Sequence, residues 1–207
     1  MQEKLLALAL TLPLLATSPL SAQDTPKASA APEAKASTPP APPAQPGTAG
    51  LGGIYGMAQK NIVKAAEKMP EEAYAFKPSP DVRSFGQLVG HLADAQFMMC
   101  SLVLGEKVVP RDVEKTKTSK ADLVAALKES CAFCERAYKI TDADAAKPME
   151  LFGMKMNGFA VLGLGLAHGY EHYGNMVTYM RIKGIVPPSS EPRTPPAEKP
   201  TGKTEKY

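Results

Sequence analysis

Apolar residues recur every three or four positions in four stretches of the chain, which is the spacing that places them on one face of an α-helix. The first stretch predicts a helix over 54–69 with an apolar face made of Ile54, Ala58, Ile62, Ala65 and Met69. Pro70 then favours a short turn at 70–73, and Pro78 and Pro80 indicate a loop.

The second stretch predicts a helix that begins at Ser84. Ser84 and Gln87 have the spacing of a capping box, in which each side chain accepts a hydrogen bond from the other residue's backbone N–H. One face of this helix is made of Leu88, His91, Ala95, Met98 and Leu102. His91 is therefore expected to point into the protein, where burial favours the neutral ring that binds metal.

Two further helices complete the pattern. One follows Ser119 and has a face made of Leu123, Leu127, Cys131, Cys134 and Tyr138. The other runs over 159–183 and ends at Gly184, a residue type common after helix C-termini. Residues 149–157 are Met-rich, and we expect an extended segment or a turn there. Because strand alternation is missing elsewhere, the sequence predicts an all-α fold, a four-helix bundle.

The two ends of the chain differ in composition from its middle. Residues 1–22 have the short apolar run and small-residue cleavage site of a signal peptide, and the run is too short to span a bilayer. Segments 23–50 and 191–207 are rich in Pro with few bulky apolar residues, so we expect a disordered linker and a disordered tail. The folded domain is expected over 51–190. The mature protein is then periplasmic or secreted, without a membrane span.

Charge argues against nucleic acid as a partner. The chain has 24 Lys and Arg against 21 Asp and Glu, a net charge of +3, and the basic residues are scattered rather than clustered.

The chain contains only three histidines. His168 and His172 are four residues apart, so in a helix their rings lie on one face, one turn apart. His91 is the only histidine left to supply a third ligand, and a metal with three protein ligands keeps a position for water or substrate. The sequence therefore predicts a divalent-metal site of His91, His168 and His172. The alternative is that these are hydrogen-bonded core histidines without a metal.

The segment 168–172 also matches H-x-x-E-H, the inverted zinc-peptidase signature, with Glu171 as general base. A peptidase of that type needs a further acidic ligand downstream, and the acids after His172 all fall in the predicted tail region: Glu191, Glu198 and Glu205. We interpret Glu171 as a solvated charge on the helix flank, and its orienting a ligand or bound water remains the alternative.

Three other polar residues lie near the histidines in the predicted helices. Asp94, one turn from His91, has the same two interpretations as Glu171. Asn175 and Tyr179 extend the histidine face, and we expect them to be bundle polar groups with hydrogen-bond partners rather than ligand contacts.

Cys131 and Cys134 form a C-x-x-C motif in the middle of a predicted helix. Redox-active motifs of this kind follow a strand at a helix start, so we interpret these two as small buried apolar residues. Thiols outside the cytoplasm tend to pair, and Cys100 has a partner in either Cys131 or Cys134 if their helices are neighbours. One of the three cysteines must then remain single.

Residues 69–78 and 83–93 resemble the first half of DinB-like (DinB/YfiT) domains, and residues 168–175 and 179–188 resemble their last helix and the segment after it. The resemblance covers about residues 54–190. It implies a four-helix bundle with a divalent-metal site made by one histidine on the second helix and two on the last, and His91, His168 and His172 stand at those places. It also implies zinc or nickel as the metal, and a homodimer as a common assembly.

Two functions follow as hypotheses. The first is a metal-dependent enzyme, either a hydrolase or a transferase that moves a small thiol to an electrophile as some DinB-like proteins do, with the ion as Lewis acid. The second is a non-catalytic exported protein that binds a metal or another ligand. It is favoured by the mostly cytoplasmic location of the thiols that such transferases use. The substrate cannot be inferred from the residues, and no catalytic residue is assigned beyond the metal ligands.

Overall fold

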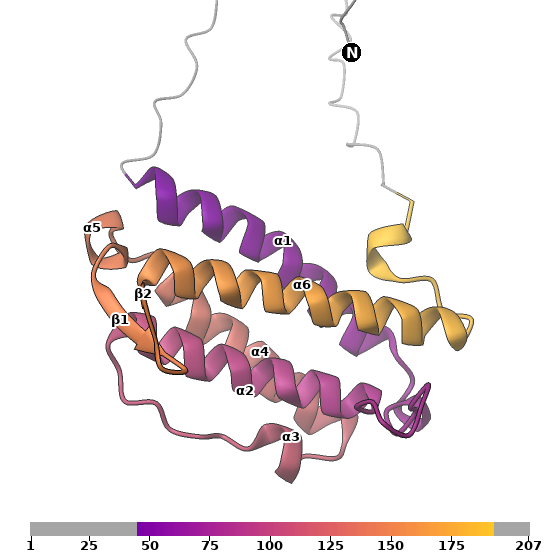
Figure 1. Ribbon diagram of the computed structural model, residues 1–207. Helices are drawn as coiled ribbons and strands as arrows, with labels where there is room; N and C mark the ends of the chain where they lie inside the picture. The colour runs from indigo at the N-terminus through magenta and orange to yellow at the C-terminus, as the bar shows by residue number, and fades with distance from the viewer. Residues whose placement is uncertain (1–44, 193–207) are drawn as a thin grey trace, which may run out of the picture. The chain divides into compact units, whose positions relative to one another are not determined.

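Four long helices form the folded part of the chain (Figure 1). The structure is a computed structural model that describes residues 45–192. The predicted signal peptide, the linker up to residue 44 and the tail from residue 193 lie outside these residues. The long helices are α1 (Pro46–Lys68), α2 (Phe85–Leu104), α4 (Lys120–Ala137) and α6 (Gly158–Ile182).

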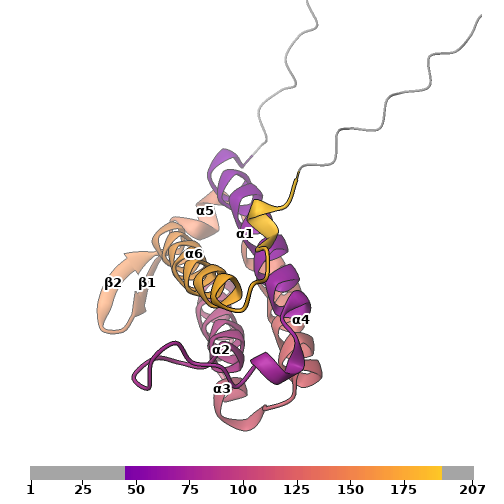
Figure 2. The ribbon, with the colours of Figure 1, turned by 90° about the vertical axis from the view of Figure 1, so that its right-hand side faces the viewer.

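The helices pack as a four-helix bundle, which confirms the predicted fold class. Helix α2 packs against α4 and α6, and α1 packs against the same two helices from the other side. Figure 2 shows α2 and α6 together on one side and α1 and α4 on the other. Each long helix contributes a fully buried side chain to one shared core: Ile62, Leu92, Leu127 and Met176. Burying an apolar side chain of this size contributes about 1.5–3 kcal/mol.

Short elements connect the long helices. They are η1 (Glu71–Ala73), α3 (Val113–Thr116), α5 (Asp142–Ala145), β1 (Pro148–Leu151), β2 (Met154–Asn157) and η2 (Pro188–Ser190). The two strands form an antiparallel hairpin, so the extended alternative for 149–157 is the correct one. Its two-residue turn has positive φ at Phe152 (53°) and Gly153 (76°), as a type I′ turn requires.

The helix ends predicted at Ser84, Ser119 and Gly184 are confirmed by the structure. The Gln87 N–H donates to Ser84 Oγ at 3.2 Å, and the Ser84 N–H donates to Gln87 Oε1 at 2.9 Å, which completes the capping box of α2. Ser119 caps α4 by accepting from the Asp122 N–H at 3.1 Å. After α6, Gly184 takes a φ of 71°, a conformation that glycine adopts without strain.

The start of α1 differs from the prediction. The helix begins at Pro46 rather than Ile54, so residues 46–50 are helical and do not belong to the predicted linker. A distant carboxylate explains the difference. Asp142 accepts hydrogen bonds from the N–H groups of Gly47 and Thr48 at 3.0 and 2.9 Å, which satisfies donors that a helix start leaves unpaired.

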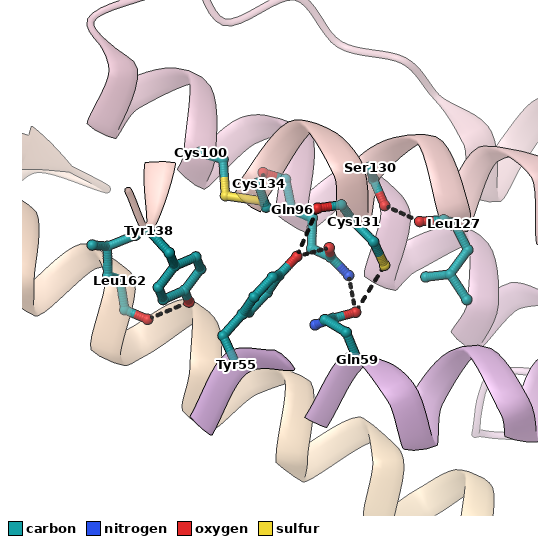
Figure 3. Close-up of a disulfide and its surroundings, with 10 residues drawn as sticks. All are labelled: Tyr55, Gln59, Gln96, Cys100, Leu127, Ser130, Cys131, Cys134, Tyr138 and Leu162. Carbon is teal, nitrogen blue, oxygen red and sulfur yellow. Dashed lines mark hydrogen bonds between the residues drawn. A yellow bond between two sulfur atoms is a disulfide. The ribbon is translucent and has the colours of Figure 1, made fainter. Parts of the chain in front are cut away.

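A disulfide links α2 to α4 (Figure 3). It joins Cys100 to Cys134, which decides between the two pairings that the sequence left open. Interpreting Cys134 only as a small apolar residue was therefore wrong, although its side chain is fully buried. Cys131 remains a thiol and donates to Gln59 Oε1 at 2.9 Å.

Within residues 45–192, none of the helices combines the length and apolar character needed to cross a membrane.

Candidate metal centre

Helices α2 and α6 bring the three histidines together. His168 Nε2 lies 3.0 Å from His91 Nε2 and 3.1 Å from His172 Nε2. The ligand atoms of all three residues lie within 4.8 Å of one another. Residues 77 positions apart in the chain thus meet at one point because α2 and α6 are packed neighbours.

Close packing of α6 places its two histidines. Gly165 and Gly169 face α2 and α1, and a Cβ at either position would just reach van der Waals contact, 3.6 Å from Met99 Sδ and from Ile62 Cδ1 respectively. The backbone of α6 therefore lies close to both neighbouring helices. His172 is buried as a result, while His91 and His168 are half-buried.

A carboxylate orients the ring of His91. Glu114 Oε2 lies 3.2 Å from His91 Nδ1, and Arg83 Nε donates to the other oxygen of the same carboxylate at 2.9 Å. Carboxylates in this position on a metal-binding histidine fix its tautomer and raise its basicity. Glu114 lies in a polar connection without apolar periodicity, so no pattern in the sequence pointed to it.

Asp94 and Gly90 determine where Glu114 lies. The Asp94 carboxylate accepts hydrogen bonds from the N–H groups of Val113 and Glu114, both at 2.9 Å. A Cβ on Gly90 would lie 2.6 Å from Glu114 Cα, so only glycine allows α3 to approach α2 this closely. Asp94 is thus neither a free surface charge nor a contact of the histidines. It anchors α3, and α3 carries Glu114.

The remaining polar residues lie as expected. Asn175 Nδ2 is 3.4 Å from His172 Nδ1, and the Tyr179 hydroxyl donates to the carbonyl of Arg83 at 2.8 Å. Both are bundle polar groups with partners, and Asn175 also touches a histidine. Glu171 is exposed, as a solvated charge would be, but it also lines the same recess as His172, so the alternative of a role toward a bound ligand or water stays open.

The surroundings of the three rings favour their neutral form. Burial is the largest cause that lowers the pKa of His91, His168 and His172 from the ordinary value of 6.5. The neighbouring cationic and imidazole groups lower each pKa further, while Glu114 opposes the shift at His91. Neutral imidazole is the form that binds a metal ion.

The donor set fits a divalent cation. Because His91 Nδ1 faces a carboxylate, the proton of the neutral ring is assigned to Nδ1, and Nε2 presents a lone pair to the other two histidines. One proton on His168 Nε2 can form a hydrogen bond with only one of its neighbours, His91 Nε2 or His172 Nε2. A cation placed between them can bind all three nitrogens. Tetrahedral metal–nitrogen bonds place ligand nitrogens roughly 3.3 Å apart, close to the observed 3.0 and 3.1 Å.

Two recesses adjoin the histidine cluster, one lined by His172 and the other by His91. The larger, of about 610 Å³, is polar and includes Arg83, Glu171 and His172 among its lining residues. The smaller, of about 290 Å³, includes His91, Val108 and Val109. A small molecule can therefore approach the histidine cluster, which distinguishes it from a closed structural metal site.

Comparison with known proteins reveals the family. The sequence matches the family model of the DinB superfamily over residues 55–176. It is 26% identical over 135 residues to the uncharacterized protein YjoA of Bacillus subtilis (strain 168), an alignment that covers 62% of this chain and 86% of YjoA.

Solved structures share the fold. A DinB-like protein from Bacillus cereus has a TM-score of 0.61 at 18% identity, with 67% of this chain and 94% of that chain covered. The DinB-like protein YjoA from Bacillus subtilis has a TM-score of 0.58 at 22% identity, with 70% and 99% covered. YfiT from Bacillus subtilis, a probable metal-dependent hydrolase with an unusual four-helix bundle topology, has a TM-score of 0.54 at 17% identity, with 67% and 88% covered.

Proposed function

The chain belongs to the DinB superfamily, and from this premise we propose that it is a metal-dependent enzyme that holds a divalent ion through His91, His168 and His172. The observation that carries the proposal is the convergence of three histidine ring nitrogens beside two recesses. We propose zinc or nickel as the ion, since both accept imidazole ligands. Hydrolysis is the first reaction to test because YfiT, which shares the fold, is a probable metal-dependent hydrolase.

Residues around the ligands have separate tasks in this proposal. Glu114 keeps the His91 proton on Nδ1, so that Nε2 remains a donor to the ion. Glu171 lines the polar recess beside His172 and accepts a proton from a water or thiol held there. Arg83 lines the same recess and offers a positive charge to an anionic group of the substrate. A divalent ion bound by the histidines supplies Lewis acidity toward the reacting water, thiol or carbonyl oxygen.

Metal analysis tests the ligand set. We expect each of the variants His91→Ala, His168→Ala and His172→Ala to lose most of its metal, measured by elemental analysis of purified protein. The losses should not add, because removing one ligand already opens the site. Thr178→Ala, an exposed change on α6, serves as the control and should keep its metal. Unchanged metal content in His91→Ala would remove α2 from the site.

A reaction screen tests catalysis. Metal-loaded protein is assayed for hydrolysis of ester, amide and lactone substrates and for transfer of small thiols to electrophiles. In the reaction that is found, Glu171→Gln should retain its metal and lower kcat by about 10²–10⁴-fold, as expected when a general base is lost. Absence of turnover from fully loaded protein in both screens would contradict the enzymatic proposal and favour the non-catalytic alternative.

We also propose that the protein is exported. The Cys100–Cys134 disulfide supports this, because such bonds persist mainly in oxidising compartments. Sequencing the N-terminus of protein recovered from the periplasm or the medium tests it. We expect a mature start near Gln23, after the small residues at 20–22, and an intact Met1 in a cytoplasmic fraction would contradict export.

A further inference from the structure

A further cavity lies on the other half of the bundle, between α1 and α4. This α1/α4 groove has a volume of about 640 Å³, within the range of small-molecule sites. Its principal lining residues are Gly52, Tyr55, Gly56, Val63, Cys131 and Tyr138. It contains none of the three histidines, so the proposed metal chemistry leaves it unexplained.

The body of the groove is mostly apolar, and two glycines of α1 line it. Tyr55 and Tyr138 stack with their ring centroids 4.1 Å apart and form part of its wall (Figure 3). Gly52 and Gly56 lie one turn apart on the α1 side, and a Cβ added at Gly56 would meet nothing within 4 Å. Gly56 lines the groove, so a larger side chain at this position would have room to extend and would take up part of the groove's volume.

Polar groups at the base of the groove are mostly paired with one another. The Tyr55 hydroxyl donates to Gln96 Oε1 at 2.9 Å, and Gln96 Nε2 donates to Gln59 Oε1 at 3.2 Å. Burial raises the pKa of the Cys131 thiol to about 12, so this group is not a nucleophile at neutral pH. The base therefore offers neither a charge nor a reactive thiol, and a ligand with an apolar body suits it.

Positive charge is concentrated at the edge of the groove. Lys60, Lys64 and Lys139 line it together with a single acid, Glu135, and Glu135 pairs with Lys139 at 3.4 Å. Among the described residues, no carboxylate lies within ion-pair distance of Lys60 or Lys64, although Glu191, which pairs with Lys68, also attracts Lys64 at longer range. Like charges four residues apart weaken a helix slightly, and an anion placed between Lys60 and Lys64 would remove that cost.

We propose that the α1/α4 groove binds a free single-chain amphiphilic carboxylate of the fatty-acid type. The apolar chain lies along Tyr55, Tyr138 and Val63, and the carboxylate lies at Lys60 and Lys64. Charge complementarity selects an anionic head, and the apolar lining with its neutral base selects an apolar tail. Binding is non-covalent, and it is independent of the proposed metal chemistry.

Isothermal titration of the full chain with sodium dodecanoate, below its micelle concentration, tests the proposal. We expect saturable binding of one molecule per chain with a Kd in the micromolar range. Gly56→Leu fills the groove and should weaken binding by at least about tenfold. Gly53→Leu is the matched control, because Gly53 is exposed on the same helix, has open space around it and lies outside the groove. Both changes replace glycine within a helix, so neither threatens folding.

Further arms separate the chemical causes. The double change Lys60→Glu and Lys64→Glu should weaken binding of dodecanoate but leave binding of neutral dodecanol unchanged. His172→Ala should bind dodecanoate like the unaltered chain. Lack of saturable binding, equal losses in Gly53→Leu and Gly56→Leu, loss of binding in His172→Ala, or binding only to anionic phospholipid vesicles would each overturn the proposal.

Discussion

At the scale of single residues, the candidate metal centre depends on side chains that do not reach the ion. Glu114 Oε2 lies 3.2 Å from His91 Nδ1, and Arg83 Nε donates to Glu114 Oε1 at 2.9 Å. The three form a chain from a surface cation to a ligand. Such outer partners typically change metal affinity by about 10–100-fold when removed.

Replacing Glu114 tests this arrangement. Glu114→Gln keeps the size of the side chain but removes the charge that holds the proton on His91 Nδ1. We expect metal affinity to fall by about 10–100-fold with the fold intact, measured by competition with a chromophoric chelator. Glu106→Gln is the matched control, because Glu106 pairs only with Arg136 at the surface and should leave affinity unchanged. Equal affinities of the Glu114→Gln and Glu106→Gln proteins would show that the carboxylate does not tune the site.

The histidines could be named from the sequence, while Glu114 could not. The spacing of His168 and His172 identifies a shared helix face, and His91 lies on the predicted inward face of α2. Glu114 reaches the site through α3, a four-residue helix whose position is set by backbone contacts to Asp94 and Gly90. Periodicity in the sequence does not encode contacts of that kind, so only the folded arrangement reveals them.

At the scale of elements, α3 can pack closely on α2 only because Gly90 has no side chain. Gly90→Ala would place a methyl group 2.6 Å from Glu114 Cα and 2.9 Å from Glu114 N, both backbone atoms that cannot rotate away. We expect a loss of about 1–3 kcal/mol in the free energy of unfolding, measured by urea denaturation of metal-free protein. Metal affinity should fall as well, because α3 must move Glu114 away from His91.

Gly174→Ala provides the comparison for that experiment. Gly174 is exposed on α6, and a Cβ there meets nothing within 4 Å. The change should stabilise the helix by about 0.5–1 kcal/mol. If the two alanine variants unfold at the same urea concentration, close packing of α3 on α2 is not the reason for glycine at position 90.

The first turn of α1 shows why element boundaries were harder to predict than element existence. The capping box of α2 lies within four consecutive residues, so local spacing revealed it. The start of α1 is held by Asp142, 95 positions from Gly47 in the chain, and Gln45 supplies no side-chain cap. Between Pro46 and Ile54 the only bulky apolar side chain is that of Leu51, and one such residue cannot establish a helical period.

Asp142 also makes the stability of α1 depend on pH. Hydrogen bonds from the backbone of Thr48 and Gly47 lower the pKa of the Asp142 carboxyl below its ordinary value of 3.8. A carboxyl whose pKa is lower in the folded than in the unfolded protein stabilises the fold while the pH is above the unfolded-state pKa. That stabilisation is lost as the pH falls through the folded-state pKa. We expect Asp142→Asn to lower Tm at pH 7 and to flatten the decline of Tm below about pH 4. Calorimetry across this range measures both effects, and Asp81→Asn, at an exposed position, should reproduce neither.

At the scale of the whole molecule, helix packing and one covalent bond fix the same arrangement. The four buried side chains of the shared core come from four different helices, so the apolar pattern alone was enough to predict a bundle. The pattern could not decide which cysteine pairs with Cys100, because Cys131 and Cys134 lie less than one turn apart on α4. The disulfide joins Cys134 to α2, while Cys131 faces Gln59 on α1.

The disulfide should provide a large share of the stability of the bundle. Cys100 and Cys134 are separated by 34 positions, and closing a loop of that length in the unfolded chain contributes about 4 kcal/mol in the chain-entropy estimate. We expect the double variant Cys100→Ala and Cys134→Ala to lose about 2–4 kcal/mol in the free energy of unfolding. Urea denaturation of both proteins, without a reductant, measures this difference in free energy. No reductant is added because Cys134 is buried and would be reduced only after the bundle opens. As a second measurement, the unaltered chain is unfolded, reduced with dithiothreitol and assayed again. Its free energy of unfolding should then fall, while the same treatment should leave the double variant unchanged. Equal stability of the oxidised chain and the double variant would mean that packing of α2 on α4 holds the fold without help from the bond.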